Sequence, residues 1–205
     1  MNYQLKLEEI INEISKQDKR YKLLLHACCG PCSSYCLEYL SKYFDIAIIY
    51  YNPNIYPDIE YNRRLNELKD FLSKISNGNT IKLKECRYNP NEYYNAVKGL
   101  EKLGERSKRC YECYKLRLEE TAKVAFEESY DYFTTTLSIS PYKDSKWINE
   151  IGEELSKKYN IKFLYADFKK KNGYKRSIEL SKKYNMYRQD YCGCVYSKVE
   201  NDEKN

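Results

Sequence analysis

Apolar positions along this chain follow either helical spacing or short continuous runs. Helical spacing predicts an amphipathic first helix that carries Leu5, Leu7, Ile10, Ile11 and Ile14. Continuous apolar runs predict buried strands at residues 21–27, 45–51, 80–85, 131–136 and 161–165. Further helical patterns lie at about 33–42, 59–74, 91–103, 111–129, 141–159 and 174–184. Turn residues separate elements at 52–57 and 77–79, and Ser33 or Ser34 is expected to cap the second helix.

Strands that alternate with helices predict an α/β fold, a mostly parallel sheet with helices on both faces. In such sheets the functional site lies outside the carboxyl ends of the strands. Residues 28–32, 52–57, Cys86 and 134–141 reach that edge, so we expect a cysteine-bound metal site there. No repeat or long linker interrupts the pattern. This predicts a single domain over residues 1–205, with a polar, frayed tail at about 198–205.

Composition narrows the class of protein. The chain has 205 residues, with 36 Lys and Arg against 30 Asp and Glu, and a net charge of +6. Because 42% of the residues are hydrophobic and 32% are charged, the chain can bury a core, which argues against wholesale disorder. No apolar run approaches the ~20 residues of a membrane span, and the N-terminus lacks the apolar stretch of a secretory signal. We expect a soluble, cytoplasmic protein with no membrane partner.

Nine cysteines change this picture. An odd number cannot pair completely within one chain, and a reducing compartment disfavours structural disulfides. The cysteines are also clustered, which indicates metal or redox chemistry. Cys36 is expected to be a buried small hydrophobe and Cys86 a structural residue at a strand end. The remaining seven fall into three groups, namely Cys28, Cys29 and Cys32, then Cys110 and Cys113, and finally Cys192 and Cys194.

The first group allows two interpretations. Neighbouring side chains in an extended segment point to opposite faces, so Cys28 and Cys29 serve one centre only if the backbone turns at Gly30-Pro31. Otherwise they serve two adjacent centres. Cys29-Gly-Pro-Cys32 also has the C-x-x-C form of a dithiol redox motif at a helix start, where the helix dipole lowers a thiol pKa.

The second and third groups suit metal or redox roles. Cys110 and Cys113 lie one helical turn apart, the spacing that binds one metal or cluster. Nearby cations are expected to lower the pKa of these two thiols. Cys192-Gly-Cys194 has a spacing that permits a strained, easily reduced disulfide, so these thiols are a redox pair or, alternatively, two further metal ligands. The cations near Cys110 are Arg106, Lys108 and Arg109.

Two other features have open interpretations. His26 is the only histidine, and it is either a core residue or a proton donor or ligand. A basic run is either a solvated face or a contact surface for phosphates. That run comprises Lys169, Lys170, Lys171, Lys175 and Arg176.

Taken together, the motifs resemble one known family, the cobalamin-independent (QueH-like) epoxyqueuosine reductases, which are iron–sulfur enzymes of tRNA queuosine synthesis. The matching stretches run in family order from about residue 23 to residue 197. They are Leu24-Leu-His-Ala-Cys-Cys-Gly-Pro-Cys32, Tyr50-Tyr-Asn-Pro-Asn-Ile-Tyr-Pro57, Arg109-Cys-Tyr-Glu-Cys-Tyr-Lys-Leu-Arg-Leu118, Phe133-Thr-Thr-Thr-Leu-Ser-Ile-Ser-Pro-Tyr142, Gly173-Tyr-Lys-Arg-Ser177 and Tyr187-Arg-Gln-Asp-Tyr-Cys-Gly-Cys194.

The resemblance implies a Rossmann-like or HUP-like fold and reduction of the epoxide of epoxyqueuosine in tRNA to queuosine. It implies that a [4Fe–4S] cluster is held by Cys28, Cys29, Cys110 and Cys113, and that Cys192 and Cys194 are a redox-active pair. A second, mononuclear iron beside the cluster would draw on one of the adjacent thiols and on Cys32 or Cys194. The electron donor is not identified by the sequence.

Removal of an epoxide oxygen as water takes two electrons and two protons. Tyr191, Asp190 and His26 are candidate proton donors. A modified base of an anticodon loop can stack on an aromatic side chain. Rings for this contact are available at Tyr51, Tyr56, Tyr142 and Tyr174.

Two other functions compete with this interpretation. A thiol–disulfide oxidoreductase would use Cys29-Gly-Pro-Cys32 and leave the other cysteines without a role. A non-enzymatic zinc-containing RNA-binding module would explain the positive charge and the two C-x-x-C pairs, but not Cys192-Gly-Cys194.

Overall fold

A five-stranded parallel sheet forms the centre of the protein, seen here in a computed structural model that describes residues 1–75 and 81–202. All neighbouring strands pair in parallel, in the order β3-β2-β1-β4-β5. The predicted α/β fold with a mostly parallel sheet is therefore confirmed. The strands are β1 (Tyr21–His26), β2 (Phe44–Tyr50), β3 (Lys82–Glu85), β4 (Tyr132–Thr135) and β5 (Lys162–Phe163).

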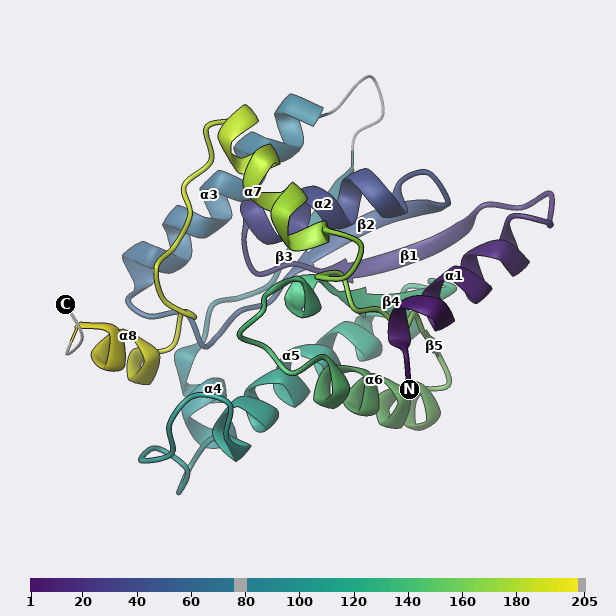
Figure 1. The fold of residues 1–205 in the computed structure, drawn as a ribbon. Coiled ribbons are helices and arrows are strands. Elements are labelled where there is room, and N and C mark those ends of the chain that lie inside the picture. The colour runs from purple at the N-terminus through teal and green to yellow at the C-terminus, as the bar shows by residue number, and fades with distance from the viewer. Residues whose placement is uncertain (76–80, 203–205) are drawn as a thin grey trace.

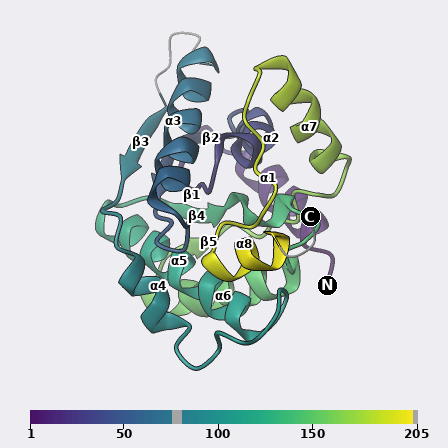
Figure 2. The same ribbon diagram turned by 90° about the vertical axis from the view of Figure 1, so that its left-hand side faces the viewer.

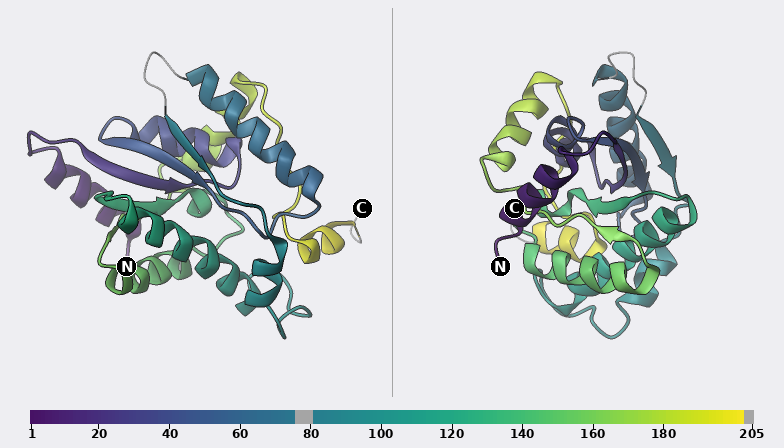
Figure 3. Two further views of the ribbon diagram at one scale, coloured as in Figure 1. Left: turned by 180° about the vertical axis from the view of Figure 1, so that it is seen from behind. Right: turned by 90° about the vertical axis from the view of Figure 1, so that its right-hand side faces the viewer.

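Helices cover both faces of the sheet (Figure 1). One face carries α1 (Tyr3–Ile14), α2 (Gly30–Leu40), α3 (Asp58–Ile75) and α7 (Gly173–Lys183), and the other carries α5 (Lys108–Glu127) and α6 (Ser145–Tyr159). The same layers are visible from behind and from the opposite side (Figure 3). None of the helices in the described ranges is long and apolar enough to cross a membrane. The shorter elements are α4 (Pro90–Ala96), the 3₁₀ helix η1 (Thr136–Ile139) and α8 (Val195–Asp202).

Strand β1 explains why the strands appear as unbroken apolar runs. Leu23 and Leu25 pack in the core beneath α1, α2 and α3, whereas Leu24 packs in a second core with α5 and α6. Alternate side chains of a strand point to opposite faces, so a sheet covered on both faces needs apolar residues at every position. Phe133 of β4 lies in the second core with Leu24.

Several boundaries differ from the sequence-based predictions. Helix α2 begins at Gly30, and its N-cap is Cys29 rather than Ser33 or Ser34, because the Cys29 thiol accepts the Cys32 amide at 3.4 Å. Helix α6 begins at Ser145, where Asp144 caps it, and not at residue 141.

The other differences lie in the second half of the chain and at its end. Helix α4 ends at Ala96, short of residue 103. The predicted frayed tail differs as well, since Val195–Asp202 forms helix α8. The predicted turn at residues 77–79 lies outside the described residues.

Close packing of α6 on β5 yields a stability prediction. A Cβ atom at Gly152 would lie 2.4 Å from the Phe163 ring, closer than real Cβ atoms come. Gly152→Ala should lower the free energy of unfolding by about 1–3 kcal/mol, the usual cost of overpacking, despite the better helix propensity of Ala. The control is Gly104→Ala, because a Cβ at Gly104 meets nothing within 4 Å. Urea denaturation measures both, and equal stability of the two variants would contradict the close packing.

Candidate active site at the carboxyl edge of the sheet

The sheet reverses its strand order at β1, which is flanked by β2 and β4. The chain leaves β1 for α2 on one face and leaves β4 for α6 on the other, so a crevice opens between them. Figure 2 looks onto this edge, where residues 185–194, here called the strap, run from α7 to α8. A cavity of about 380 Å³ lies at this edge. Its lining includes Cys28, Cys32, Arg64, Arg106, Cys110, Arg117, Tyr142, Lys143, Tyr174, Arg188, Asp190, Tyr191 and Cys192.

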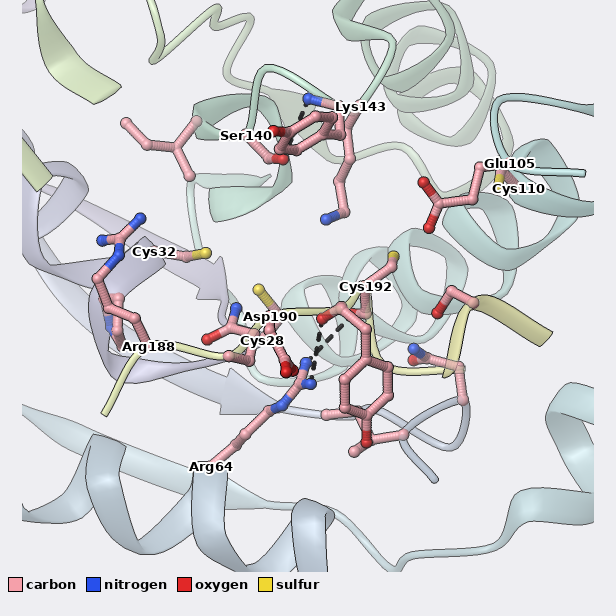
Figure 4. Close-up of a pocket in the computed structure, with 18 of the residues that line it drawn as sticks. Cys28, Cys32, Arg64, Glu105, Cys110, Ser140, Lys143, Arg188, Asp190 and Cys192 are labelled. Carbon is pink, nitrogen blue, oxygen red and sulfur yellow. Dashed lines mark hydrogen bonds between the residues drawn. The ribbon is translucent and has the colours of Figure 1, made fainter. Parts of the chain in front are cut away.

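The strap is fastened to α3 by one buried side chain. Arg64 donates from Nη1 to the Cys192 carbonyl at 3.1 Å and from Nη2 to the Tyr191 carbonyl at 3.3 Å (Figure 4). Its Nε donates to Glu60 at 2.6 Å, which compensates the buried charge. Gly193 has φ +130°, and a Cβ there would lie 3.0 Å from Arg64 Nη1. The glycine of Cys192-Gly-Cys194 is therefore required by the backbone and by the close approach of Arg64.

Three thiols from the β1–α2 junction lie together. The sulfur atoms of Cys28, Cys29 and Cys32 are all within 4.8 Å of one another, close enough to hold a metal ion. Cys28 and Cys29 are 3.8 Å apart at their sulfurs, since the backbone turns into α2 at Gly30. The turn places both adjacent thiols on one side, so they can serve one centre.

Without a bound cation, ionisation of one of these thiols opposes ionisation of the other two. Hydrogen bonds from the other two thiols lower the pKa of Cys28 well below its usual value. Burial, together with hydrogen bonding to Cys28, raises the pKa of Cys29 to about 12. The pKa of Cys32 is raised by its hydrogen bonds to Cys28 and Cys29. One thiolate forms readily, and a bound metal is what would deprotonate the other two.

The other thiols lie at the N-terminal end of α5 and on the strap. Cys110 and Cys192 line the cavity, and their proximity contributes to a raised pKa of Cys110. Cys113 and Cys194 pack with each other in a small buried cluster that also holds Tyr93. The Cys194 sulfur accepts the Ser197 amide at 3.4 Å, at the start of α8. The structure therefore brings both C-terminal cysteines to the predicted Cys110–Cys113 pair.

Two cations accompany the thiols, and no sequence motif singles out either of them. Lys143 directs its amine into the cavity (Figure 4), where burial would lower its pKa but Cys192 and Cys28 raise it. Arg117 is buried, and its Nη2 donates to the Cys113 sulfur at 3.3 Å. Burial likewise opposes the charge of Arg117, and Cys113 and Cys192 raise its pKa. Thiols are the foremost groups that favour the charge of each cation, and Tyr114 also contributes.

The predicted effect of the cations before Cys110 is wrong. Burial raises the pKa of Cys110, and it raises the pKa of Cys113 to about 12 even though Arg117 lowers it. Arg109 cannot help, because its guanidinium donates instead to Glu200 and to the Glu101 carbonyl. The sequence places Arg109 next to Cys110 but does not reveal that the Arg109 guanidinium binds Glu200 on α8.

His26 is fully buried, and both its ring nitrogens are occupied. Nε2 lies 3.1 Å from the Tyr51 carbonyl and must donate to it, so Nδ1 accepts the Thr135 hydroxyl at 2.8 Å. Burial lowers the pKa of His26 to about 4, and the charge of Arg117 contributes. This histidine joins the ends of β1, β2 and β4 and is not among the cavity residues, which supports the core interpretation.

The other candidate side chains divide between the cavity and elsewhere. Asp190 and Tyr191 line the cavity, although the Tyr191 hydroxyl donates to the Tyr56 carbonyl. Of the four proposed stacking rings, Tyr142 and Tyr174 line the cavity. The Tyr51 hydroxyl is instead bonded to Glu92 at 2.6 Å.

The basic run at residues 169–176 is largely neutralised. Lys169 pairs with Asp167 at 2.8 Å, Lys171 pairs with Glu8, and Arg176 pairs with both Glu38 and Glu179. Two cations line the cavity, namely Arg106 and Arg188. Neither forms an ion pair with a carboxylate among the described residues. Arg106 lies over the ring of Tyr142 and Arg188 over that of Tyr174, each 5.9 Å from the ring centroid.

Comparison with known proteins identifies the family. The family described as epoxyqueuosine reductase QueH matches residues 23–200. The proteins named epoxyqueuosine reductase QueH from Streptococcus pyogenes and Staphylococcus epidermidis are 44% and 43% identical, over 96% and 98% of this chain and 78% and 86% of theirs. The chain belongs to the epoxyqueuosine reductase QueH family. The resemblance inferred from the motifs is confirmed, and the QueH protein of Thermotoga maritima also matches at 37% identity over 89% of this chain and 93% of its own.

A solved structure shares the fold at low sequence identity. It is described as a predicted subunit of a tRNA methyltransferase from Methanocaldococcus jannaschii. The TM-score is 0.52 at 16% identity, covering 78% of this chain and 76% of the other. This likeness concerns the fold alone.

Burial of neutral His26 leads to a pH prediction for the metal-free protein. Its pKa is about 4 in the folded chain and 6.5 when exposed, so below pH 6.5 only the unfolded chain takes up the proton. The free energy of unfolding should fall by about 3 kcal/mol from this group as the pH drops from about 6.5 to about 4. Urea denaturation of the wild type and of His26→Asn at several pH values isolates the effect. Parallel pH profiles for the two proteins would show that His26 is not the cause.

Proposed function

We propose that this protein reduces the epoxide of epoxyqueuosine in tRNA to the cyclopentene of queuosine. The observation that carries the proposal is the convergence of thiols from three separate segments on one cavity in a chain of the QueH family. An oxidoreductase is what the family name implies. The thiols supply both the ligands and the electrons that such a reaction needs.

The proposed cofactor is a [4Fe–4S] cluster with Cys28, Cys29, Cys110 and Cys113 as ligands. Two observations support a fit between these residues and an anionic cluster. Burial and hydrogen bonding to Cys28 raise the pKa of the Cys29 thiol, and the buried Arg117 donates to the Cys113 sulfur at 3.3 Å and has no carboxylate among the ion pairs of the described residues. A second, mononuclear iron would draw on Cys32 or Cys194. When bound, these centres supply single electrons and a Lewis acid for the departing oxygen.

Cys192 and Cys194 are proposed as the two-electron donor. Oxidation of two thiols to a disulfide releases two electrons and two protons. Loss of the epoxide oxygen as water consumes both pairs and leaves a carbon–carbon double bond, so the reaction balances. Cys192 lines the cavity and Cys194 packs on Cys113, which supports transfer between the pair and the proposed cluster. An external reductant must then regenerate the thiols.

Asp190 is the proposed route for protons to the departing oxygen. It lines the cavity, whereas the Tyr191 hydroxyl is already bonded to Tyr56 and His26 lies outside the cavity with both nitrogens occupied. Arg64 holds the carbonyls of Tyr191 and Cys192 and so keeps this part of the strap in place.

The competing functions fit the geometry less well. A thiol–disulfide oxidoreductase needs an accessible cysteine of low pKa at the helix start. Cys29 is instead 1% exposed, with its pKa raised to about 12 and its sulfur accepting both the Cys32 amide and the Gln189 side chain. A zinc module would use the two C-x-x-C pairs as ligands and leave Cys192, which lines the cavity, without a role.

Substitution of single cysteines tests the proposed assignment. Cys110→Ser and Cys113→Ser should lose most iron and the brown colour, because each removes a proposed ligand. Cys192→Ser and Cys194→Ser should keep the iron of the cluster and its visible spectrum but lose reduction of epoxyqueuosine tRNA in a single-turnover assay. Cys36→Ser, at a buried thiol outside the cavity, is the matched control and should keep iron and turnover. Iron loss from both strap variants would reject the redox pair, and full iron in both α5 variants would reject the cluster ligands.

We further propose that tRNA contacts the cavity through Arg106 and Arg188, with the rings of Tyr142 and Tyr174 available for stacking. Affinity for anticodon-loop RNA should fall with salt on a log–log plot, and each phosphate contact contributes a slope of about one unit. Arg106→Ala with Arg188→Ala should flatten the slope by about two units. The charge-matched control is Lys170→Ala with Lys175→Ala in the basic run. If only the control variant shows a flatter slope, the RNA contacts the basic run and not Arg106 and Arg188.

A further inference from the structure

Arg117 differs from the other large buried arginines. Arg64, Arg109 and Arg117 are among the largest fully buried side chains of the described chain. Arg64 forms an ion pair with Glu60 and Arg109 with Glu200. The ion pairs of the described residues include no carboxylate partner for Arg117, which is 2% exposed.

A buried guanidinium without an anion is costly, because burial removes the water that stabilises its charge. The Cys113 sulfur accepts from Arg117 at 3.3 Å and is the foremost group that favours the charge of Arg117, followed by Cys192, Cys28 and Tyr114. Cys113 is itself buried, and its thiolate is equally costly in isolation. Each charge therefore depends on the other, and the pair is stable when the sulfur is anionic, as in a metal-bound thiolate.

The geometry fixes the donor on the sulfur. Arg117 follows Cys113 by one turn of α5, and its Nε donates to the Cys113 carbonyl at 3.0 Å. This first bond orients the planar guanidinium, so that Nη2 donates to the Cys113 sulfur at 3.3 Å. A lysine would carry the same charge but could not hold both acceptors at once.

We propose that Arg117 is the positioning residue that raises the reduction potential of the proposed cluster, by donating a hydrogen bond and a positive charge to the sulfur of Cys113. The inference rests on the proposed function, in which Cys113 is a ligand. Addition of an electron makes the cluster more negative, and a donor at a ligand sulfur stabilises the more negative state. Arg117 thus makes the cluster easier to reduce by a weak donor.

An anaerobic redox titration followed by EPR tests this role, together with the iron content of each variant. In Arg117→Met the equilibrium constant for one-electron reduction should fall about tenfold, which is a midpoint shift of about 59 mV to lower potential. Arg117→Lys should fall between the wild type and Arg117→Met, since it keeps the charge without the fixed donor. Lys115→Met is the matched control, because it removes one charge from the same helix at an exposed ion pair with Glu154.

The outcomes separate this inference from the proposed function. Variants that keep their iron and show a lowered potential, with an unchanged control, support Arg117. Retained iron with the wild-type potential in both Arg117 variants overturns the inference and leaves the cluster in place. If Arg117→Met does not accumulate as folded protein, the potential of Arg117→Lys decides. A wild-type protein without iron overturns the cluster and this inference together.

Discussion

Charge balance among buried thiols is the constraint on which the site depends. Cys28, Cys29 and Cys32 lie within 4.8 Å of one another, and their pKa values diverge because one thiolate suppresses the next. On the other side of the cavity, thiols are the foremost groups that favour the positive charges of Arg117 and Lys143, with a further contribution from Tyr114. An anionic thiolate–metal centre would satisfy both sides at once.

The fold makes this balance possible by bringing three distant segments to one edge. Strand β1 delivers the first thiols, α5 the second pair, and the strap returns the third pair across the crevice. Because Arg64 holds the strap by two backbone carbonyls, Cys192 is positioned by α3, an element that carries no cysteine itself. The reactive edge is therefore a property of the tertiary structure, and no single motif contains it.

The sequence predicted the sheet, the cysteine-bearing edge and the family, because strand periodicity and cysteine spacing are local signals. It did not predict the partners that depend on tertiary packing. Arg117 and Lys143 are ordinary cations in the sequence, and Arg109 is adjacent to Cys110 yet turns to Glu200 on α8. The polar composition of helix α8 predicts a frayed end of the chain. Two contacts hold the helix instead, because the Cys194 sulfur accepts the Ser197 amide at 3.4 Å and Arg109 pairs with Glu200 at 3.0 Å. The basic run was the clearest charge signal, but Lys171 and Arg176 pair with carboxylates of distant segments and Lys169 pairs with the nearby Asp167.

In the proposed site these thiols together hold an iron–sulfur centre. Metals and acid-labile sulfide can be determined in wild-type protein purified anaerobically. The proposed cluster requires iron and sulfide in comparable amounts, with additional iron if the second site is filled. Zinc without sulfide, or a protein free of metal in which all nine cysteines titrate as thiols, would contradict it.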